Sequence, residues 1–398
     1  MKIKILTIII LISCHFGFSQ NINSIDSLIN NSIKLKVFPG AQIYIKKDDF
    51  VYNKSYGFHT YDSIIKIEND HIYDLASITK TIGGSLAIMK LVEDYNFDIN
   101  SRIKKYFKDF KRNELGDSKI IDLLTHTAGW QPYINHPKFL IKKNGNLKKR
   151  FISDHKKSNN IFLSKKLFVK NSFYDQIKKR IKKTELNKVG KYKYSGLFFC
   201  LIPELVKSIT GIDFENYLNN SFYKFLNYKL TFNPLKNHSL NKIAPTEIDK
   251  FFRKELVHGN VHDETSALMG GISANSGLFS NAESLANLLL ILIDENSILI
   301  EPNILKFFTK NHIQNDSLNE RGLGFDKVRF VSNGNKIYPH HKLSNDSFGH
   351  TGFTGTMYWV DPKKELIVVF LTNSVYPSRE KNKLGEMKVR EKLLDLIL

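Results

Sequence analysis

Ser77 and Lys80 stand three residues apart in DLASITKTIGGSLAIMKLVEDY, residues 74–95. The apolar spacing that follows predicts a helix, and residues three apart on a helix share one face, so the two side chains can touch. A lysine held against a buried helix face is partly desolvated and can accept the serine proton. Backbone N–H groups at the helix start can hold a developing oxyanion. The pair alone is a weak signal, because a chain rich in serine and lysine contains this spacing by chance.

The elements that must position this pair come from both ends of the chain. AQIYIKKDDFVYNKSYGFHT, residues 41–60, alternates as two strands joined by a turn at 47–49. TMYWVD and LIVVFLTNS, separated by a turn at 362–364, predict a second hairpin, and a helix is expected from about 385 to 398. Strands from both ends most economically share one antiparallel sheet. The predicted class is therefore α+β, with a mostly helical insert at about residues 90–270.

The positive charge does not by itself indicate a nucleic-acid-binding protein. The formal net charge is +20, and lysines concentrate between residues 142 and 193. No RNA-binding motif with aromatic residues, zinc-finger spacing or basic zipper accompanies them, so we expect no nucleic acid partner. The lysines are interpreted as solvated surface, with peripheral association to an anionic envelope polymer as the alternative.

The first residues have the layout of an export signal. Lys2 and Lys4 precede an apolar run from residue 5 to 12, which is too short to anchor the chain across a bilayer. We expect a signal peptide at 1–19, followed by one hydrolase domain at 20–398, and a periplasmic or secreted protein. The alternative is a lipoprotein, because LISC, which ends at Cys14, resembles a lipobox in which that cysteine is lipidated. If Cys14 is removed, Cys200 in LFFCLI is the only cysteine left, and it is interpreted as a small buried hydrophobe.

Five blocks of the chain resemble, in order and spacing, those of the serine beta-lactamase-related family. This family includes class C beta-lactamases, D-alanyl-D-alanine carboxypeptidases and related esterases. The resemblance runs from about residue 38 to the end and implies a beta-lactamase/transpeptidase-like fold. The blocks are HIYDLASITKTIGGSLAIMKLVEDY at 71–95, IIDLLTHTAGW at 120–130, YSGLFFCLIPELVKSITG at 194–211, GGISANSGLFSNAESLANLL at 270–289 and FGHTGFTGTMYWVDP at 348–362.

The resemblance assigns roles to the first two motifs. Ser77 matches the family nucleophile and Lys80 its paired base. The second motif is usually Tyr-x-Asn and here reads Tyr194-Ser195-Gly196, so the proton-relay role transfers to Tyr194. The amide that would orient a substrate does not transfer, because Gly196 has no side chain. Tyr217-Leu218-Asn219 is a rival literal match in a later helix, and Tyr192 is a weaker candidate.

The third motif, usually Lys-Thr-Gly, reads His350-Thr351-Gly352. Histidine at this place can still donate toward a substrate carboxylate or the tyrosine oxygen, and its charge would titrate near neutrality. Gly352 would let a substrate backbone approach the strand closely. The N–H of Phe353 is expected to be the second oxyanion donor beside that of Ser77.

Other histidines and acids have structural interpretations. His262 and Asp263 are expected to line the cleft or brace the GGISANSG loop, and Asp122 and His126 to fix a helix end and turn beside the site. Zinc was considered because histidines cluster, but the ligand sets of known zinc hydrolases are incomplete, so no metal or other cofactor is predicted. The histidines concerned are His258, His262, His340 and His341.

The sequence therefore predicts an exported, metal-free serine acyl hydrolase that works through an acyl-enzyme on Ser77. Its substrate is expected to be a peptidoglycan-derived peptide, as for a D,D-carboxypeptidase, or a small ester. The alternative is a catalytically inactive cell-wall binding protein that retains the fold. Gly196 favours that alternative, whereas the set Ser77, Lys80, Tyr194 and His350 favours the enzyme. The oligomeric state stays open.

Overall fold

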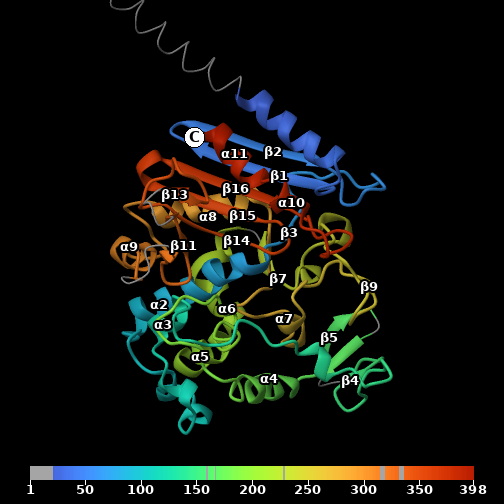
Figure 1. The fold of residues 1–398 in the computed structure, drawn as a ribbon, viewed down its shortest axis with the longest axis vertical. Helices are drawn as coiled ribbons and strands as arrows, with labels where there is room; N and C mark the ends of the chain where they lie inside the picture. The colour runs from blue at the N-terminus through green and yellow to red at the C-terminus, as the bar shows by residue number, and fades with distance from the viewer. Residues whose placement is uncertain (1–20, 158–159, 166, 227–228, 314–318, 331–335) are drawn as a thin grey trace, which may run out of the picture.

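A six-stranded antiparallel sheet forms the upper layer of the molecule in Figure 1. The computed structural model describes residues 21–157, 160–165, 167–226, 229–313, 319–330 and 336–398. The strand order is β11-β14-β15-β16-β1-β2, so strands from the two ends of the chain pair at β16–β1, as predicted. The strands are β1 (Gly40–Lys47), β2 (Phe50–Gly57), β11 (Asp326–Lys327), β14 (Phe348–Thr351), β15 (Met357–Asp361) and β16 (Leu366–Thr372).

Side chains alternate between the two faces of the sheet along each strand, and the central strands β1, β15 and β16 are buried on both faces. Ile43 and Ile45 of β1 pack with helix 21–34 and with α11 (Val389–Ile397), which cover one face. Tyr44 joins the larger core on the other face, where α8 (Ala282–Ile293) packs against the sheet. This two-sided burial explains why β15 and β16 are almost uninterrupted apolar runs.

Most of the rest of the chain forms the helix-rich lower part of Figure 1, together with small sheets, whereas α10 (Lys383–Glu386) and β13 (Lys336–Tyr338) lie beside the main sheet. The helices are α2 (Leu86–Tyr95), α3 (Ile120–Leu124), α4 (Phe173–Ile181), α5 (Ile202–Thr210), α6 (Phe214–Leu218), α7 (Glu264–Leu268), α9 (Pro302–Thr309) and α10 (Lys383–Glu386). The remaining strands are β3 (Tyr73–Asp74), β4 (Ile152–Ser153), β5 (Asn160–Ser164), β6 (Leu167–Lys170), β7 (Leu230–Phe232), β8 (Ile248–Asp249), β9 (Glu255–Leu256), β10 (Leu278–Ser280), β12 (Arg329–Phe330) and β13 (Lys336–Tyr338).

Both predicted hairpins are confirmed, and two details differ. The predicted carboxyl-terminal helix is divided into α10 and α11, because Lys388 adopts a left-handed φ of 50° between them. The helix after Ser77 is not one regular α-helix. It begins as a 3-10 turn (Ala76–Ile78), continues as a π-helical segment (Lys80–Ser85) and becomes α-helical at α2.

The predicted signal peptide and Cys14 lie outside the described residues. Within the residues that are described, no helix has both the length and the apolar character needed to cross a bilayer. Cys200 is buried in the larger core, as predicted. Burial raises the pKa of its thiol to about 12, so Cys200 is unsuited to act as a nucleophile.

Candidate active site

The turn that carries Ser77 is held in an unusual backbone conformation. Ala76, immediately before it, has a left-handed φ of 47°, which costs a non-glycine residue roughly 1–2 kcal/mol. The buried carboxylate of Asp74 accepts the Ala76 N–H at 2.8 Å and the His262 N–H at 2.6 Å. Burial raises the pKa of Asp74. This carboxylate, which the sequence analysis missed, therefore fixes the nucleophile turn to the loop before α7.

The predicted contact between Ser77 and Lys80 is confirmed. Lys80 Nζ lies 3.0 Å from Ser77 Oγ and donates to the carbonyl oxygen of Asn275 at 2.9 Å. The lysine is only 2% exposed, and the apolar face beyond it, including Ile82 and Leu86, is buried as predicted. The aliphatic stem is thus enclosed by the core while the amine faces the serine.

Tyr194 completes the group around the lysine. Lys80 Nζ lies 5.3 Å from the centre of the Tyr194 ring, and the His126 ring packs against the same tyrosine with centroids 4.6 Å apart. His126 Nδ1 accepts the Ser195 N–H at 3.2 Å, and burial lowers the imidazole pKa well below its usual value. His126 thereby supports the tyrosine motif, whereas the sequence predicted that it fixes a helix end and turn beside the site.

The rival motif does not reach this group. Tyr217 is buried in α6, and neither it nor Asn219 lines either of the two cavities beside Ser77. Tyr192 does line one of them, where the Arg321 guanidinium lies 5.4 Å from its ring centre.

The end of β14 lies directly against the nucleophile turn. Thr356 Oγ1 donates to the Leu75 carbonyl at 3.1 Å, and Thr354 Oγ1 donates to the Asp74 carbonyl at 2.7 Å. A Cβ atom on Gly352 would overlap the Leu75 carbonyl oxygen, so this approach requires glycine. Phe353, which follows Gly352, lines both cavities beside Ser77 together with that serine.

His350 reaches the site but does not fit a cationic role. Its ring is 2% exposed, and Nδ1 donates to the Thr351 carbonyl at 2.7 Å. Burial first, and then the charges of Arg321 and Lys80, lower its pKa well below the usual value. The expectation that His350 titrates near neutrality is therefore wrong. A neutral ring leaves Nε2 as a buried acceptor, for which the described residues supply no partner.

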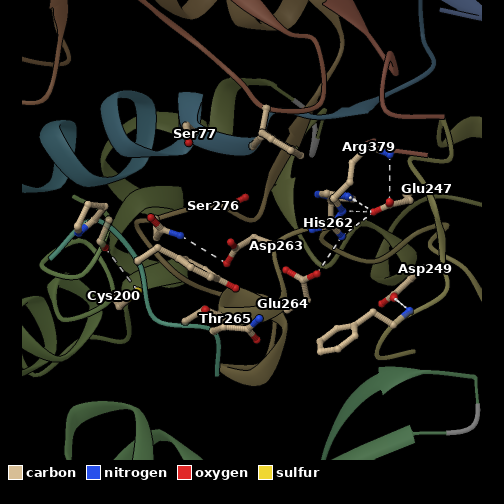
Figure 2. A pocket seen from close by; sticks show the side chains of 18 of the residues that line it. Ser77, Cys200, Glu247, Asp249, His262, Asp263, Glu264, Thr265, Ser276 and Arg379 are labelled. Carbon is tan, nitrogen blue, oxygen red and sulfur yellow. Dashed lines mark hydrogen bonds and ion pairs between the residues drawn. The ribbon is translucent and has the colours of Figure 1, made fainter. Parts of the chain in front are cut away.

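Two cavities meet at Ser77. The first, of about 650 Å³, is the cavity of Figure 2, where Ser77 is labelled. Lys80, Tyr194 and Phe353 also line it. The second, of about 460 Å³, shares Ser77, Tyr194 and Phe353 with it and adds His350, Thr351 and Gly352. Every site residue predicted from the sequence thus lines one or both cavities.

Charged residues missed in the sequence analysis form the far wall of the first cavity. Figure 2 shows Arg379, Glu247 and His262 gathered on one side of it. Arg379 bridges Glu247 and Glu264, and the His262 ring donates to Glu247 at 2.8 Å. Burial would raise the pKa of Glu247, but these hydrogen bonds outweigh it and hold the pKa at about 2. His262 also stacks on the exposed ring of Phe353, with centroids 5.7 Å apart. His262 and Asp263 line this cavity, as predicted.

The second cavity is rich in arginine. Arg321, only 1% exposed, pairs with Asp326 through Nη1, while its Nε and Nη2 have no hydrogen-bond partner in the part of the chain that the structure describes. Arg329 lines the same cavity. Arg390 from α11 donates to the carbonyls of Gly352 and Thr356 at 3.2 and 3.0 Å, and so braces the turn after β14. These arginines come from segments far from the recognised motifs.

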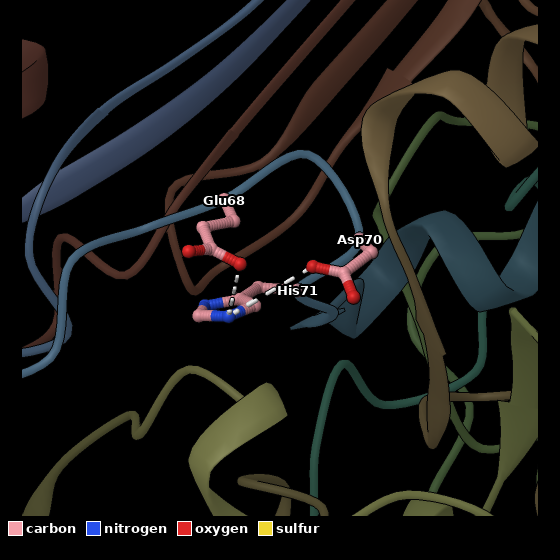
Figure 3. Close-up of side chains that lie close together, drawn as sticks. All are labelled: Glu68, Asp70 and His71. Atoms are coloured by element: carbon pink, nitrogen blue, oxygen red, sulfur yellow. Dashed lines mark ion pairs between the residues drawn. The ribbon is translucent and has the colours of Figure 1, made fainter.

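A possible metal site lies away from the two cavities. Glu68, Asp70 and His71 bring their ligand atoms together in the loop before β3 (Figure 3). Lys242 Nζ lies 3.1 Å from a Glu68 oxygen and 3.0 Å from an Asp70 oxygen, so an ammonium group already compensates the two carboxylates. His71 Nδ1 is bonded to the His59 ring at 2.9 Å. The cluster is therefore a structural ion-pair network.

The histidines considered for zinc have protein partners. His258 Nε2 lies 2.6 Å from the Ile243 carbonyl oxygen, and His340 Nε2 lies 2.7 Å from an Asp395 carboxylate oxygen. His340 and His341 stack on each other, with ring centroids 4.4 Å apart. These contacts account for the orientation of these rings.

Comparisons with known proteins agree with this geometry. A profile of the Beta-lactamase family matches residues 25–389. A protein of Salmonella heidelberg named "Putative D-alanyl-D-alanine carboxypeptidase" is 29% identical over 392 residues, which cover 90% of this chain and 84% of that protein. Among solved structures, a class C beta-lactamase gives a TM-score of 0.67 at 14% identity, covering 95% of this chain and 97% of its own. A hydrolase with promiscuous acyltransferase activity gives 0.66 at 14% identity, covering 96% and 98%.

Proposed function

Because the chain belongs to the Beta-lactamase family of serine hydrolases, we propose that it removes a carboxyl-terminal D-alanine from peptidoglycan-type peptides. The observation that carries this proposal is the guanidinium of Arg321, a residue that lines the cavity containing Ser77 and whose Nε and Nη2 have no hydrogen-bond partner among the described residues. A buried guanidinium with unused donors suits the carboxylate of a leaving amino acid. The similar Salmonella protein, whose name gives this activity, supports the same assignment.

The catalytic sequence follows from the contacts around the serine. Ser77 Oγ attacks the carbonyl of the scissile peptide bond while Lys80 and Tyr194 take its proton. The N–H groups of Ser77 and Phe353 hold the oxyanion, and one donor of this kind is worth about 3 kcal/mol of barrier. Passing the proton to the leaving nitrogen breaks the C–N bond and releases D-alanine. Water then attacks the acyl-enzyme ester, its proton returns to Ser77 Oγ, and the shortened peptide leaves.

The test compares two peptides that differ only at the leaving end. One ends in a free D-alanyl-D-alanine carboxylate and the other in its carboxamide. We expect release of D-alanine from the first and a much slower reaction of the second, because the carboxamide carries no charge for Arg321. Ser77→Ala should abolish release. Equal rates on the two peptides would contradict the carboxylate role of Arg321.

A small ester is the second candidate substrate, favoured by the apolar residues Leu197 and Phe251 beside the polar wall of the first cavity. An enzyme of this kind would hydrolyse nitrophenyl esters efficiently and release no D-alanine from muropeptides. An inactive binding protein would do neither and would also resist acylation of Ser77. The same panel of substrates therefore separates the three functions.

We also propose that the protein works outside the cytoplasm. The basic start and apolar run of residues 1–19 support export, and the surplus of lysine supports peripheral attachment to anionic envelope polymers. Mass spectrometry of the protein recovered from its own cells tests this. A mature chain that begins near Gln20 indicates a cleaved signal, a lipidated Cys14 indicates a lipoprotein, and an intact Met1 contradicts export.

A further inference from the structure

Asn275 contacts the catalytic lysine through its backbone and Asp263 through its side chain. It lies in the loop between α7 and β10, and its carbonyl oxygen accepts a hydrogen bond from Lys80 Nζ at 2.9 Å. Its side-chain Nδ2 donates to Asp263 Oδ1 at 3.4 Å. Asn275 also lines the first cavity together with Ser77. The loop therefore brings a carboxamide to the cavity that contains Ser77, while its backbone supports the lysine.

The side chain of Asn275 occupies the space beside Gly196. A Cβ atom on Gly196 would overlap Asn275 Oδ1 and lie 3.2 Å from Asn275 Cγ. The backbone around Gly196 cannot easily move away, because its N–H donates to the Pro132 carbonyl at 3.2 Å and Ser195 Oγ donates to the Gln131 carbonyl at 2.6 Å. Glycine at 196 and asparagine at 275 are thus sterically complementary.

We propose that Asn275 is the specificity residue that binds an amide group in the acyl part of the substrate, next to the scissile carbonyl. Its Nδ2 carries two N–H groups, of which Asp263 accepts one, so the other can donate to a substrate carbonyl. Its Oδ1 can accept a substrate N–H. A carboxamide therefore matches both edges of a peptide group, and the preferred acyl groups are those of N-acylated amino acids.

This inference deepens the proposed function and rests on it, because the proposed function places the leaving group in the second cavity and so leaves the first cavity for the acyl part. It changes the meaning of Gly196: the missing side chain at 196 is compensated from another loop. The two cavities that share Ser77 then bind different parts of the substrate. Asn275 in the first binds the acyl part, and Arg321 in the second binds the leaving group.

The experiment measures acylation of Ser77 by two activated esters of equal length. One is an N-acetyl-D-alanyl ester, and in the other a two-carbon unit replaces the amide. Stopped-flow release of the alcohol and intact-protein mass give the acylation rate without requiring turnover. We expect the wild type to prefer the amide ester by about tenfold, the worth of one good hydrogen bond. Asn275→Ala keeps the backbone contact to Lys80 and should reduce that preference to near unity.

Matched variants separate recognition from damage to the fold. Asn135→Ala removes an exposed carboxamide at another place on the same cavity and should keep the tenfold preference. Gly196→Asn alone should slow both esters, because the new side chain collides with Asn275. Gly196→Asn combined with Asn275→Gly should restore the preference, because the carboxamide now comes from residue 196.

The outcomes distinguish this inference from the proposed function. An Asn275→Ala protein that melts like the wild type, labels fully with a fluorophosphonate and still prefers the amide ester tenfold would overturn the inference. A wild type that acylates both esters equally would overturn it as well. Failure to release D-alanine from a muropeptide, with the ester preference intact, would contradict only the carboxypeptidase assignment.

Discussion

Thr356 Oγ1 donates to the carbonyl oxygen of Leu75 across 3.1 Å, which ties the turn after β14 to the turn that carries the nucleophile. The two segments lie at opposite ends of the sequence. Their contact is made tight by Gly352, because any side chain there would occupy the space of the Leu75 carbonyl. The relative position of the two expected oxyanion donors therefore depends on one glycine.

Gly352→Ala tests this dependence. The added methyl group must displace backbone atoms, which we expect to cost about 1–3 kcal/mol of unfolding free energy. Acylation should slow by more than this loss of stability explains, because the two donors move apart. Thermal melting and acylation rates at a temperature where the variant is fully folded separate the two effects. A folded variant with an unchanged rate would show that the spacing is not critical.

Ser77 should be the only residue labelled by a fluorophosphonate. Its hydroxyl is the one that contacts Lys80 Nζ, at 3.0 Å. We expect one label per chain in the wild type and none in Ser77→Ala, as read by intact mass and peptide mapping. Ser276→Ala is the matched control, because Ser276 lines the same cavity without contacting the lysine, and it should label normally. Labelling that persists in Ser77→Ala would refute the assignment of the nucleophile.

Lys80→Met should slow acylation by roughly 10²–10⁴-fold, the usual contribution of a general base. The methionine side chain retains most of the buried aliphatic stem, so the free energy of unfolding should change much less. Lys193→Met, one residue from Tyr194 and exposed to solvent, is the control and should acylate normally. The rates are obtained from the burst of a chromogenic ester, and a Lys80→Met protein with an undiminished burst would remove the lysine from the mechanism.

The preference for a carboxylate should not depend on His350 ionisation. Because burial keeps the pKa of His350 well below its usual value, the ring is neutral at neutral pH and stays so as pH rises. The ratio of kcat/KM for the free-carboxylate peptide to that for its carboxamide should therefore stay constant between about pH 6 and pH 8. A ratio that falls through this range in the wild type but not in His350→Gln would restore the cationic role.

Glu247 should stabilise the fold down to acidic pH. Its usual pKa of 4.5 is lowered to about 2 in the folded protein, despite burial, by hydrogen bonds from His262 and Arg379. A carboxylate with a lowered pKa contributes its full stabilisation above the unfolded pKa and loses it as pH falls toward the folded one. The free energy of unfolding of the wild type, measured in urea, should thus decrease as the pH falls from about 4.5 to about 2. In Glu247→Gln that part of the pH dependence should disappear, and identical curves would contradict the assignment.

Local patterns predicted the elements that local forces determine. Both hairpins were predicted correctly, from the alternation in β1 and β2 and from the apolar runs of β15 and β16. The three-residue spacing correctly predicted the contact of Ser77 with Lys80. β14 was not predicted because FGHT is short and mixed in character. The break at Lys388 was not predicted because lysine is a good helix former elsewhere.

The missed site residues are those that only tertiary contacts bring in. Asp74 resembles any acid before a helix until its bonds to Ala76 and His262 are known. Arg321 reaches the site from a loop far along the chain, and Asn275 lies within a recognised block whose side-chain direction the sequence does not reveal. The charge state expected for His350 was wrong because burial cannot be inferred from a histidine in a glycine-rich turn.

The pairing of β1 with β16 also governs when this protein can acquire its structure during synthesis. Ala41 of β1 is opposite Thr372 of β16 in that ladder. The sheet can therefore form completely only after β16, near the end of the chain, has been synthesised. Long-range pairing of this kind slows folding, so the main sheet closes late in synthesis. The catalytic turn packs against the segment after β14, and it is therefore assembled only after the last strands arrive.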